Sequence, residues 1–149
     1  MARKPKTKIR HGRPMTTPIP LPSHPLEWWR TEHAEFFNGA AVVAMRNALA
    51  TVVVLGESGW RAAAAGDAPA AIGLALRLNP QRSTGNAYDL IMTALAACAA
   101  DGSDGAALVL SHLMRKMPNA SNTHGAIATS WLLRSFAQVT RRSDLGEPL

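Results

Sequence analysis

The chain has 149 residues, of which 47% are hydrophobic, and this is enough to build the core of one domain. Its single cysteine excludes an intramolecular disulfide framework, and the prevalence of alanine over β-branched and aromatic residues favours helix over strand. The formal net charge of +6 is unevenly distributed, so it describes one segment of the chain and excludes a uniformly basic protein surface.

The positive charge is concentrated at the N-terminus. Residues 1–14 contain no acid and carry six cationic side chains, Arg3, Lys4, Lys6, Lys8, Arg10 and Arg13. The other ten Lys and Arg, which is 16 less these six, are balanced by ten Asp and Glu. Closely spaced prolines follow, and each holds the preceding residue extended. We therefore predict an extended or disordered tail over residues 1–24, a helical domain over 25–142 and a frayed C-terminus over 143–149.

The first helix is predicted to begin at Pro25. Proline is favoured at the first helical position, and either His24 or Ser23 would serve as the N-cap. The apolar run that follows extends this helix as far as Leu55. Because such a helix is longer than average, a break near Asn38 is the alternative.

Capping residues and loop signals divide the rest of the chain into shorter helices. These are predicted over residues 58–65, 68–78, 86–100, 104–116 and 123–141. Asp67, Asn86 and Asp104 are the predicted N-caps of the middle three. The resulting fold class is all-α, a small bundle of five or six helices behind a basic, proline-rich N-terminal tail.

No group of residues in the sequence has the spacing of a catalytic or metal site. Glu32, His33 and Glu35 are potential ligands, but adjacent positions diverge by about 100° around a helix and do not face one ion. Residues 56–60 lack the second glycine that a nucleophile elbow requires. Cys98 lies in an apolar run, which favours a buried and unreactive thiol. We therefore expect no catalytic residue, no metal and no cofactor, and hence a protein that is not an enzyme.

The apolar run from Gly39 to Gly56 has the length of a candidate membrane span. Arg46 lies near its centre, where insertion of an arginine costs about 2.5–3.5 kcal/mol, so we expect a buried helix of a cytoplasmic protein instead. A buried arginine needs a partner. Arg46 is therefore predicted either to pair internally with Asp89 or Glu57, or to anchor a partner chain at an interface.

The aromatic residues of the first helix are the second feature with a bearing on binding. Trp28, Trp29, Phe36 and Phe37 form the one dense aromatic cluster in the sequence. They are interpreted either as residues of the core and of a surface on which the N-terminal tail docks, or as an exposed patch that binds a partner. Together with Arg46 they are the predicted protein-interface residues.

The cationic tail indicates a function more directly than any other segment. Six uncompensated charges attract polyanions, largely without regard to sequence, although a solubilising tail, an acidic protein groove or a membrane surface are alternatives. We expect a non-enzymatic accessory or adaptor protein whose six tail cations engage nucleic acid or a nucleoprotein assembly, while the helical body binds a protein partner or self-associates. The second hypothesis is a protein-binding regulator, an inhibitor or assembly factor, that binds without nucleic acid. It would use the Trp28–Phe37 helix and the proline-rich part of the tail, docked as an extended strap.

Overall fold

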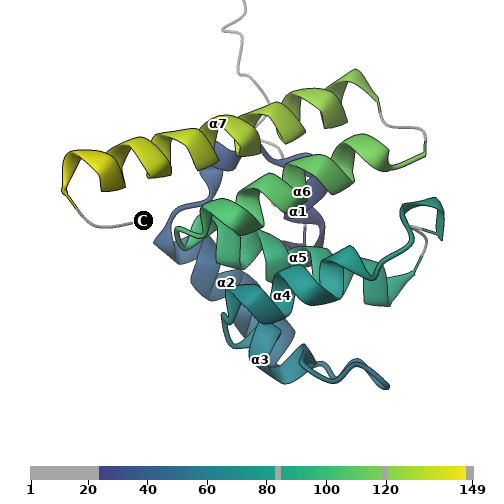
Figure 1. Cartoon of the computed structure of the whole chain (residues 1–149). Coiled ribbons are helices and arrows are strands. Elements are labelled where there is room, and N and C mark those ends of the chain that lie inside the picture. Colours follow the sequence, from purple (N-terminus) through teal and green to yellow (C-terminus); the bar gives the residue numbers. More distant parts are fainter. Residues whose placement is uncertain (1–23, 83–84, 119–120, 147–149) are drawn as a thin grey trace, which may run out of the picture.

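The computed structural model describes residues 24–82, 85–118 and 121–146, and every regular element in these segments is a helix (Figure 1). The predicted all-α class is therefore confirmed. The predicted tail, apart from its last residue His24, lies outside the described residues. The elements in chain order are η1 (Pro25–Glu27), α1 (Trp28–Thr31), η2 (Ala34–Phe36), α2 (Gly39–Ala50), α3 (Trp60–Ala64), α4 (Ala68–Leu76), η3 (Pro80–Arg82), α5 (Asn86–Ala100), α6 (Asp104–Lys116) and α7 (Asn122–Asp144), where η marks a 3₁₀ helix.

The long first helix of the sequence prediction is divided into four shorter elements. His24 is the N-cap of η1, and its side chain accepts a hydrogen bond from the Leu26 amide. The alternative, a break near Asn38, is confirmed, since the side-chain oxygen of Asn38 caps the start of α2 by accepting a hydrogen bond from the Ala41 amide. A second break, at Glu32, was not expected. The backbone of Glu32 has an extended conformation, and this ends α1. The helix also ends at Ala50 and not at Leu55, and no described helix is long and apolar enough to cross a membrane.

The predicted N-caps of the middle helices are partly confirmed. The Asp67 carboxylate accepts a hydrogen bond from the first turn of α4, as expected. Asn86 and Asp104, however, are the first residues within α5 and α6, whose N-caps are Gly85 and Ser103. The Ser103 hydroxyl caps α6, and Asp104 at the first helical position places a negative charge at the positive end of the helix dipole.

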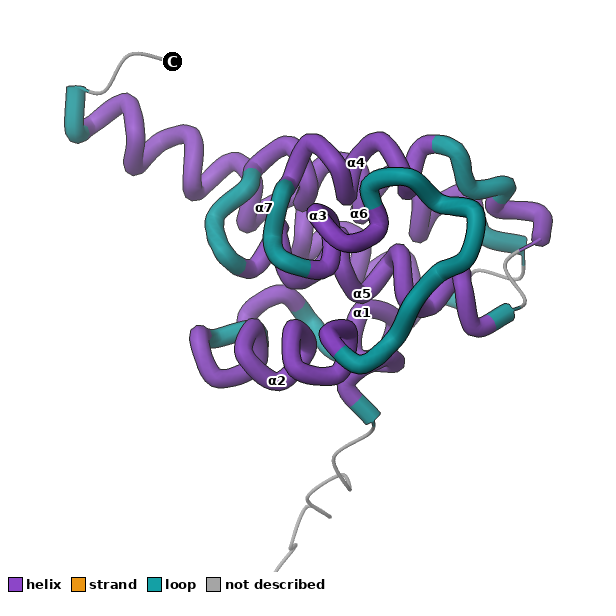
Figure 2. Tube along the Cα trace, turned by 90° about the horizontal axis from the view of Figure 1, so that it is seen from below, coloured by secondary structure: helices purple, strands orange, loops and turns teal. Residues whose placement is uncertain are grey.

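Helix α5 is the centre of the core. Figure 2 shows it between α2 on one side and α4 and α6 on the other. Eleven of its fifteen residues are buried, and they span all sides of the helix and not one stripe. A helix that is apolar all round must be surrounded by other elements, so the alanine-rich run of α5 explains why the remaining helices pack around it.

Cys98 of α5 is a buried core residue, as the sequence predicts, and burial raises the pKa of its thiol from the ordinary 9.0 to about 11. We expect no reaction of the native thiol with a disulfide reagent at neutral pH and rapid reaction after unfolding in urea.

The raised pKa of the Cys98 thiol also predicts a pH dependence of stability. Because the unfolded chain loses the thiol proton first, the free energy of unfolding should fall as the pH rises from 9.0 to about 11. The urea concentration at the midpoint of unfolding, measured across that pH range, tests this prediction. The difference between the wild type and Cys98→Ala isolates the contribution of the thiol. A pH dependence equal in the two proteins would contradict it.

Arg46 forms an internal ion pair, but with a residue that the sequence analysis did not name. Its Nη2 lies 2.8 Å from Asp101 Oδ2, whereas Asp89 and Glu57 each pair with another arginine. The prediction of those two partners was therefore wrong. The guanidinium also covers Gly66, where an added Cβ would lie 2.7 Å from Arg46 Nη2 and where φ is +107°. Both facts show that Arg46 is fitted into the junction of α2, α3 and the end of α5.

Candidate protein-binding surface on the last helix

Helix α7 is the longest element, with 23 residues, and it forms an outer layer of the bundle (Figure 1). It begins with a capping box in which the Ser121 hydroxyl and the His124 side chain each bond to the other's backbone amide. Its inner face, formed by Ile127, Ala128, Trp131 and Ser135, is buried. The remaining faces of the helix are therefore the part of α7 available for other contacts.

Polar contacts near both ends hold α7 antiparallel to α6. Arg115 of α6 donates to the Thr129 hydroxyl over 2.8 Å near the start of α7. Near its end, Arg142 lies 3.5 Å from the Asp104 carboxylate and donates to the carbonyl of Gly102. These contacts set the register of the two helices and keep α7 in place along most of its length.

The second support of α7 is the segment around η2, about a hundred positions earlier in the chain. The rings of Phe37 and Trp131 have their centroids 4.8 Å apart. The Ser130 hydroxyl accepts a hydrogen bond of 2.9 Å from the Ala34 amide. The break between α1 and α2 thus has a structural role, because it lets this segment run beside α7.

Arg134 ties α7 to two other parts of the chain. Its guanidinium donates to the carbonyls of Ala34 over 2.6 Å, of Phe37 over 3.1 Å and of Ala100 over 2.7 Å. It pairs with no carboxylate of the described residues. Burial, and to a smaller extent the charge of Arg141, lowers the pKa of Arg134. Arg134 is therefore a structural clamp, since its donors are used within the protein.

A groove of about 570 Å³ lies between η2 and α7. His33 and Glu35 line one wall, and Leu133, Gln138 and Arg141 are among the residues of the other. Glu35 and Arg141 are exposed, and neither forms an ion pair with any residue in the described ranges. The groove thus carries one free carboxylate and one free guanidinium on an otherwise mostly uncharged surface.

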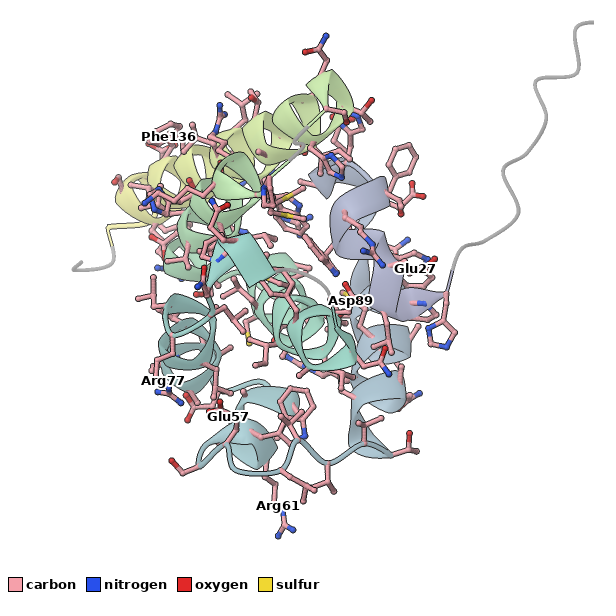
Figure 3. All side chains as sticks on the ribbon, turned by 90° about the vertical axis from the view of Figure 1, so that its right-hand side faces the viewer. Glu27, Glu57, Arg61, Arg77, Asp89 and Phe136 are labelled. Atoms are coloured by element: carbon pink, nitrogen blue, oxygen red, sulfur yellow. The ribbon has the colours of Figure 1, made fainter. Side chains whose placement is uncertain are left out.

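The outward face of α7 carries a row of exposed, uncharged residues that we call the α7 seam. It consists of Ala126, Thr129, Leu133, Phe136, Thr140 and Ser143, all exposed and spaced alternately by three and four positions. Leu133 is 62% exposed and Phe136 59%, and Phe136 projects from the surface at the upper left of Figure 3. This spacing is that of the contact positions of a coiled coil, so the seam has the pattern of a helix that packs against another helix.

The hydroxyl groups of the seam do not oppose such packing. Thr129 donates to the carbonyl of Gly125, and Thr140 to that of Phe136, each four residues earlier in α7. Ser143 makes the same kind of bond to the carbonyl of residue 139. With the hydroxyl hydrogens used within the helix, burial of the seam would leave no new unsatisfied donor.

The structure separates the residues that the sequence predicts to form a protein interface. Trp29 and Phe37 are 0% and 3% exposed and belong to the core, while Trp28 is half-buried. Phe36 is 65% exposed, and Arg46 is engaged with Asp101. The α7 seam was not predicted, although its three-and-four spacing is visible in residues 126–143, because Ala and Thr do not form an obvious apolar stripe in the sequence. A role of Phe36 or Arg46 in binding stays a prediction.

No protein-family model matches this chain, and no curated protein or solved structure is detectably similar to it. The assignment of α7 as a binding surface therefore depends on the geometry of the helix alone. Within the described segments, no three His, Cys, Asp or Glu side chains are grouped so that they could hold a metal ion. Glu32, His33 and Glu35 do not share one helix, since α1 ends before Glu32.

A small charged cluster marks the opposite side of the molecule from Phe136. Arg30 lies 3.1 Å from Asp89 and 3.8 Å from Glu27, and Figure 3 shows the two acids side by side on the right. Burial raises the pKa of Asp89, while Arg30 limits the rise. Glu27 is three positions from His24, where the described chain begins, so the described chain begins on a different side of the molecule from Phe136.

Proposed function

We propose that this protein is a non-enzymatic accessory or adaptor protein of the cytoplasm. In this proposal its basic N-terminal segment engages nucleic acid or a nucleoprotein assembly, and its helical body binds protein through α7. The observation that carries the proposal is the division of charge along the chain. Six cations and no acid occupy residues 1–14, whereas ten bases and ten acids share the rest. A reducing compartment is the usual setting for a single unpaired cysteine such as Cys98.

The ion pairs of the body support this reading of the charges. Of the ten acids, Glu147 lies outside the described residues, and five of the remaining nine form ion pairs. These five are Glu27, Glu57, Asp89, Asp101 and Asp104. Asp67 is used as a helix cap. Few carboxylates of the body are left to neutralise six cations, so the N-terminal segment keeps its attraction for an external polyanion.

The placement of the two surfaces also suits an adaptor. Glu27, close to the start of the described chain, and Phe136 of the α7 seam lie on different sides of the molecule (Figure 3). A polyanion held near the start of the body would therefore leave Phe136 accessible. Exposed aromatic and leucine side chains in a row are typical of surfaces that bind protein.

The nucleic-acid part of the proposal predicts a steep dependence of affinity on salt. If all six cations contact phosphates, the log–log slope on duplex DNA is about −5, and affinity falls roughly a thousandfold between about 50 and 200 mM salt. Fluorescence anisotropy with a generic DNA duplex and a single-stranded RNA measures this. The matched control keeps the chain length and replaces the six cations by glutamine. Equal binding by both proteins, or no binding by either at low salt, would refute this part.

A second function is favoured by the α7 seam itself, which requires no nucleic acid. The chain would then be a protein-binding regulator, an inhibitor or assembly factor. The Trp28–Phe37 segment has only Phe36 as a large exposed aromatic residue, whereas the seam has two large exposed apolar residues on one helix. A chain that binds neither DNA nor RNA, yet retains a specific protein partner, would support this second function over the first.

A further inference from the structure

We propose that the occupant of the α7 seam is the α7 helix of a second copy of this chain, packed antiparallel about a two-fold axis. This inference rests on the proposed function, in which α7 binds protein, and it names the partner. Three observations support a second copy as the occupant: the pattern of the seam, the two unpaired charges beside it, and the position of α7 in the fold.

The pattern of the seam is self-complementary. An axis between Leu133 and Phe136 sets Leu133 of each copy against Phe136 of the other. The same register pairs Thr129 with Thr140 and Ala126 with Ser143. Every layer thus joins two uncharged side chains, and the two large apolar residues meet at the centre, where interface residues contribute most.

The charges beside the seam favour a second copy over an unrelated helix. Glu35 and Arg141 line one groove, are exposed and pair with no described residue. In a two-fold interface every contact between two different positions occurs twice. The antiparallel register sets Arg141 level with Ala128 of the second copy, which lies within one helical turn of Ser130. The Ser130 hydroxyl accepts a hydrogen bond from the Ala34 amide and so places Glu35 beside this part of α7. Glu35 of each copy would therefore meet Arg141 of the other.

The position of α7 leaves room for a second body. Figures 1 and 2 show α7 as an outer helix whose last turns project beyond the other elements. Residues 140–146 are all exposed. A second α7 laid along the seam therefore meets the outer side of the molecule, beside the groove that Leu133 lines, and the two bodies lie on opposite sides of the paired helices.

A second cavity has no comparable self-complementarity. It measures about 660 Å³, lies beside the 51–59 loop and α3, and is lined by apolar residues with Glu57 and Arg61. Glu57 already pairs with Arg77, 3.1 Å away, and both lie at the lower left of Figure 3. Arg61 points into solvent there and forms no ion pair with an acid of the described residues. The α7 seam is for this reason the surface assigned to self-association.

Sedimentation equilibrium of the full chain over a wide range of concentration tests the dimer. The wild type is expected to shift from monomer to dimer as its concentration rises. Leu133→Glu and Phe136→Glu should each raise the dimer dissociation constant about thirtyfold or more, as for a central interface residue. Leu55→Glu is the matched control, because Leu55 is 89% exposed and lies outside the seam, and it should leave the constant unchanged. All three side chains are exposed, so a glutamate at any of them is expected to leave the bundle folded, and circular dichroism verifies this.

Two charge variants test the geometry itself. Glu35→Lys and Arg141→Glu should each weaken the dimer, since each sets like charges against one another at both ends of the two-fold interface. Mixed in equal amounts, the two variants should form a heterodimer about as tight as the wild type, because both pairs then join opposite charges. Only pairing between copies produces this recovery.

A wild type that stays monomeric at every concentration overturns the inference, as does a mixture of the charge variants that recovers no association. A monomer that binds a different protein through Leu133 and Phe136 overturns it too, but leaves the proposed adaptor function standing. Failure of the proposed nucleic-acid function is detected separately, by the glutamine control of the N-terminal segment.

Discussion

Replacing Trp131 by alanine is expected to lower the free energy of unfolding by about 3–5 kcal/mol. The indole is fully buried in α7 and packs against Phe37, with ring centroids 4.8 Å apart. Alanine would leave a cavity at the place where α7 meets the η2 segment, and rigid neighbours on both sides limit how far that cavity collapses. Since small domains are stable by only about 5–15 kcal/mol, this one change should remove a large part of the stability.

Urea denaturation followed by circular dichroism measures this effect. Trp131→Phe keeps most of the volume and should cost clearly less, which provides a folded variant if the alanine form fails to fold. Leu55→Ala is the surface control, with an expected change within about 0.5 kcal/mol because its side chain is almost fully exposed. A cost for Trp131→Ala as small as that of the control would show that α7 is not anchored through this residue.

Replacing Arg134 by methionine is expected to cost about 3 kcal/mol. The substitution keeps the stem of the side chain but removes the donors to the carbonyls of Ala34, Phe37 and Ala100. Hydrogen bonds from a charged donor contribute about 1.5–3 kcal/mol each, although water entering the groove would compensate for part of the loss. Arg61→Met, at an arginine that points into solvent, is the matched control and should change stability by less than about 0.5 kcal/mol.

The two substitutions should not be additive. The Arg134 guanidinium carbon lies 5.7 Å from the centroid of the Trp131 ring, and both residues hold the segment that contains Ala34 and Phe37. Residues that share partners in this way commonly show coupling energies of about 0.5–3 kcal/mol. A double-mutant cycle measures the coupling. Strict additivity would mean that the cation and the indole support α7 independently.

These expectations connect the stability of the fold with the proposed binding surface. The α7 seam is presented by a helix whose inner face is held by Trp131 and whose groove wall is held by Arg134. Variants that loosen either contact should also weaken any association through Leu133 and Phe136. Variants of the seam itself should leave the unfolding of the monomer almost unchanged, because those side chains are exposed.

Local signals account for much of what could be predicted. Asp67 caps α4 because its side chain reaches an amide only three positions away, and Asn38 starts α2 in the same way. The burial of Cys98 follows from a run of apolar neighbours on one helix. Even where the prediction missed, at Asn86 and Asp104, the error was one residue, since a cap and the first helical position favour similar residues.

By itself, the sequence determined the helical class, most helix starts and the concentration of positive charge in residues 1–14, because propensity, capping and charge are properties of residues close together in the chain. Only the tertiary structure decided that Arg46 pairs with Asp101, that Trp29 and Phe37 are interior, and that Leu133 and Phe136 face outward. Those outcomes depend on which helices meet, and segments about a hundred positions apart, such as those of Ala34 and Arg134, become neighbours only when the bundle packs.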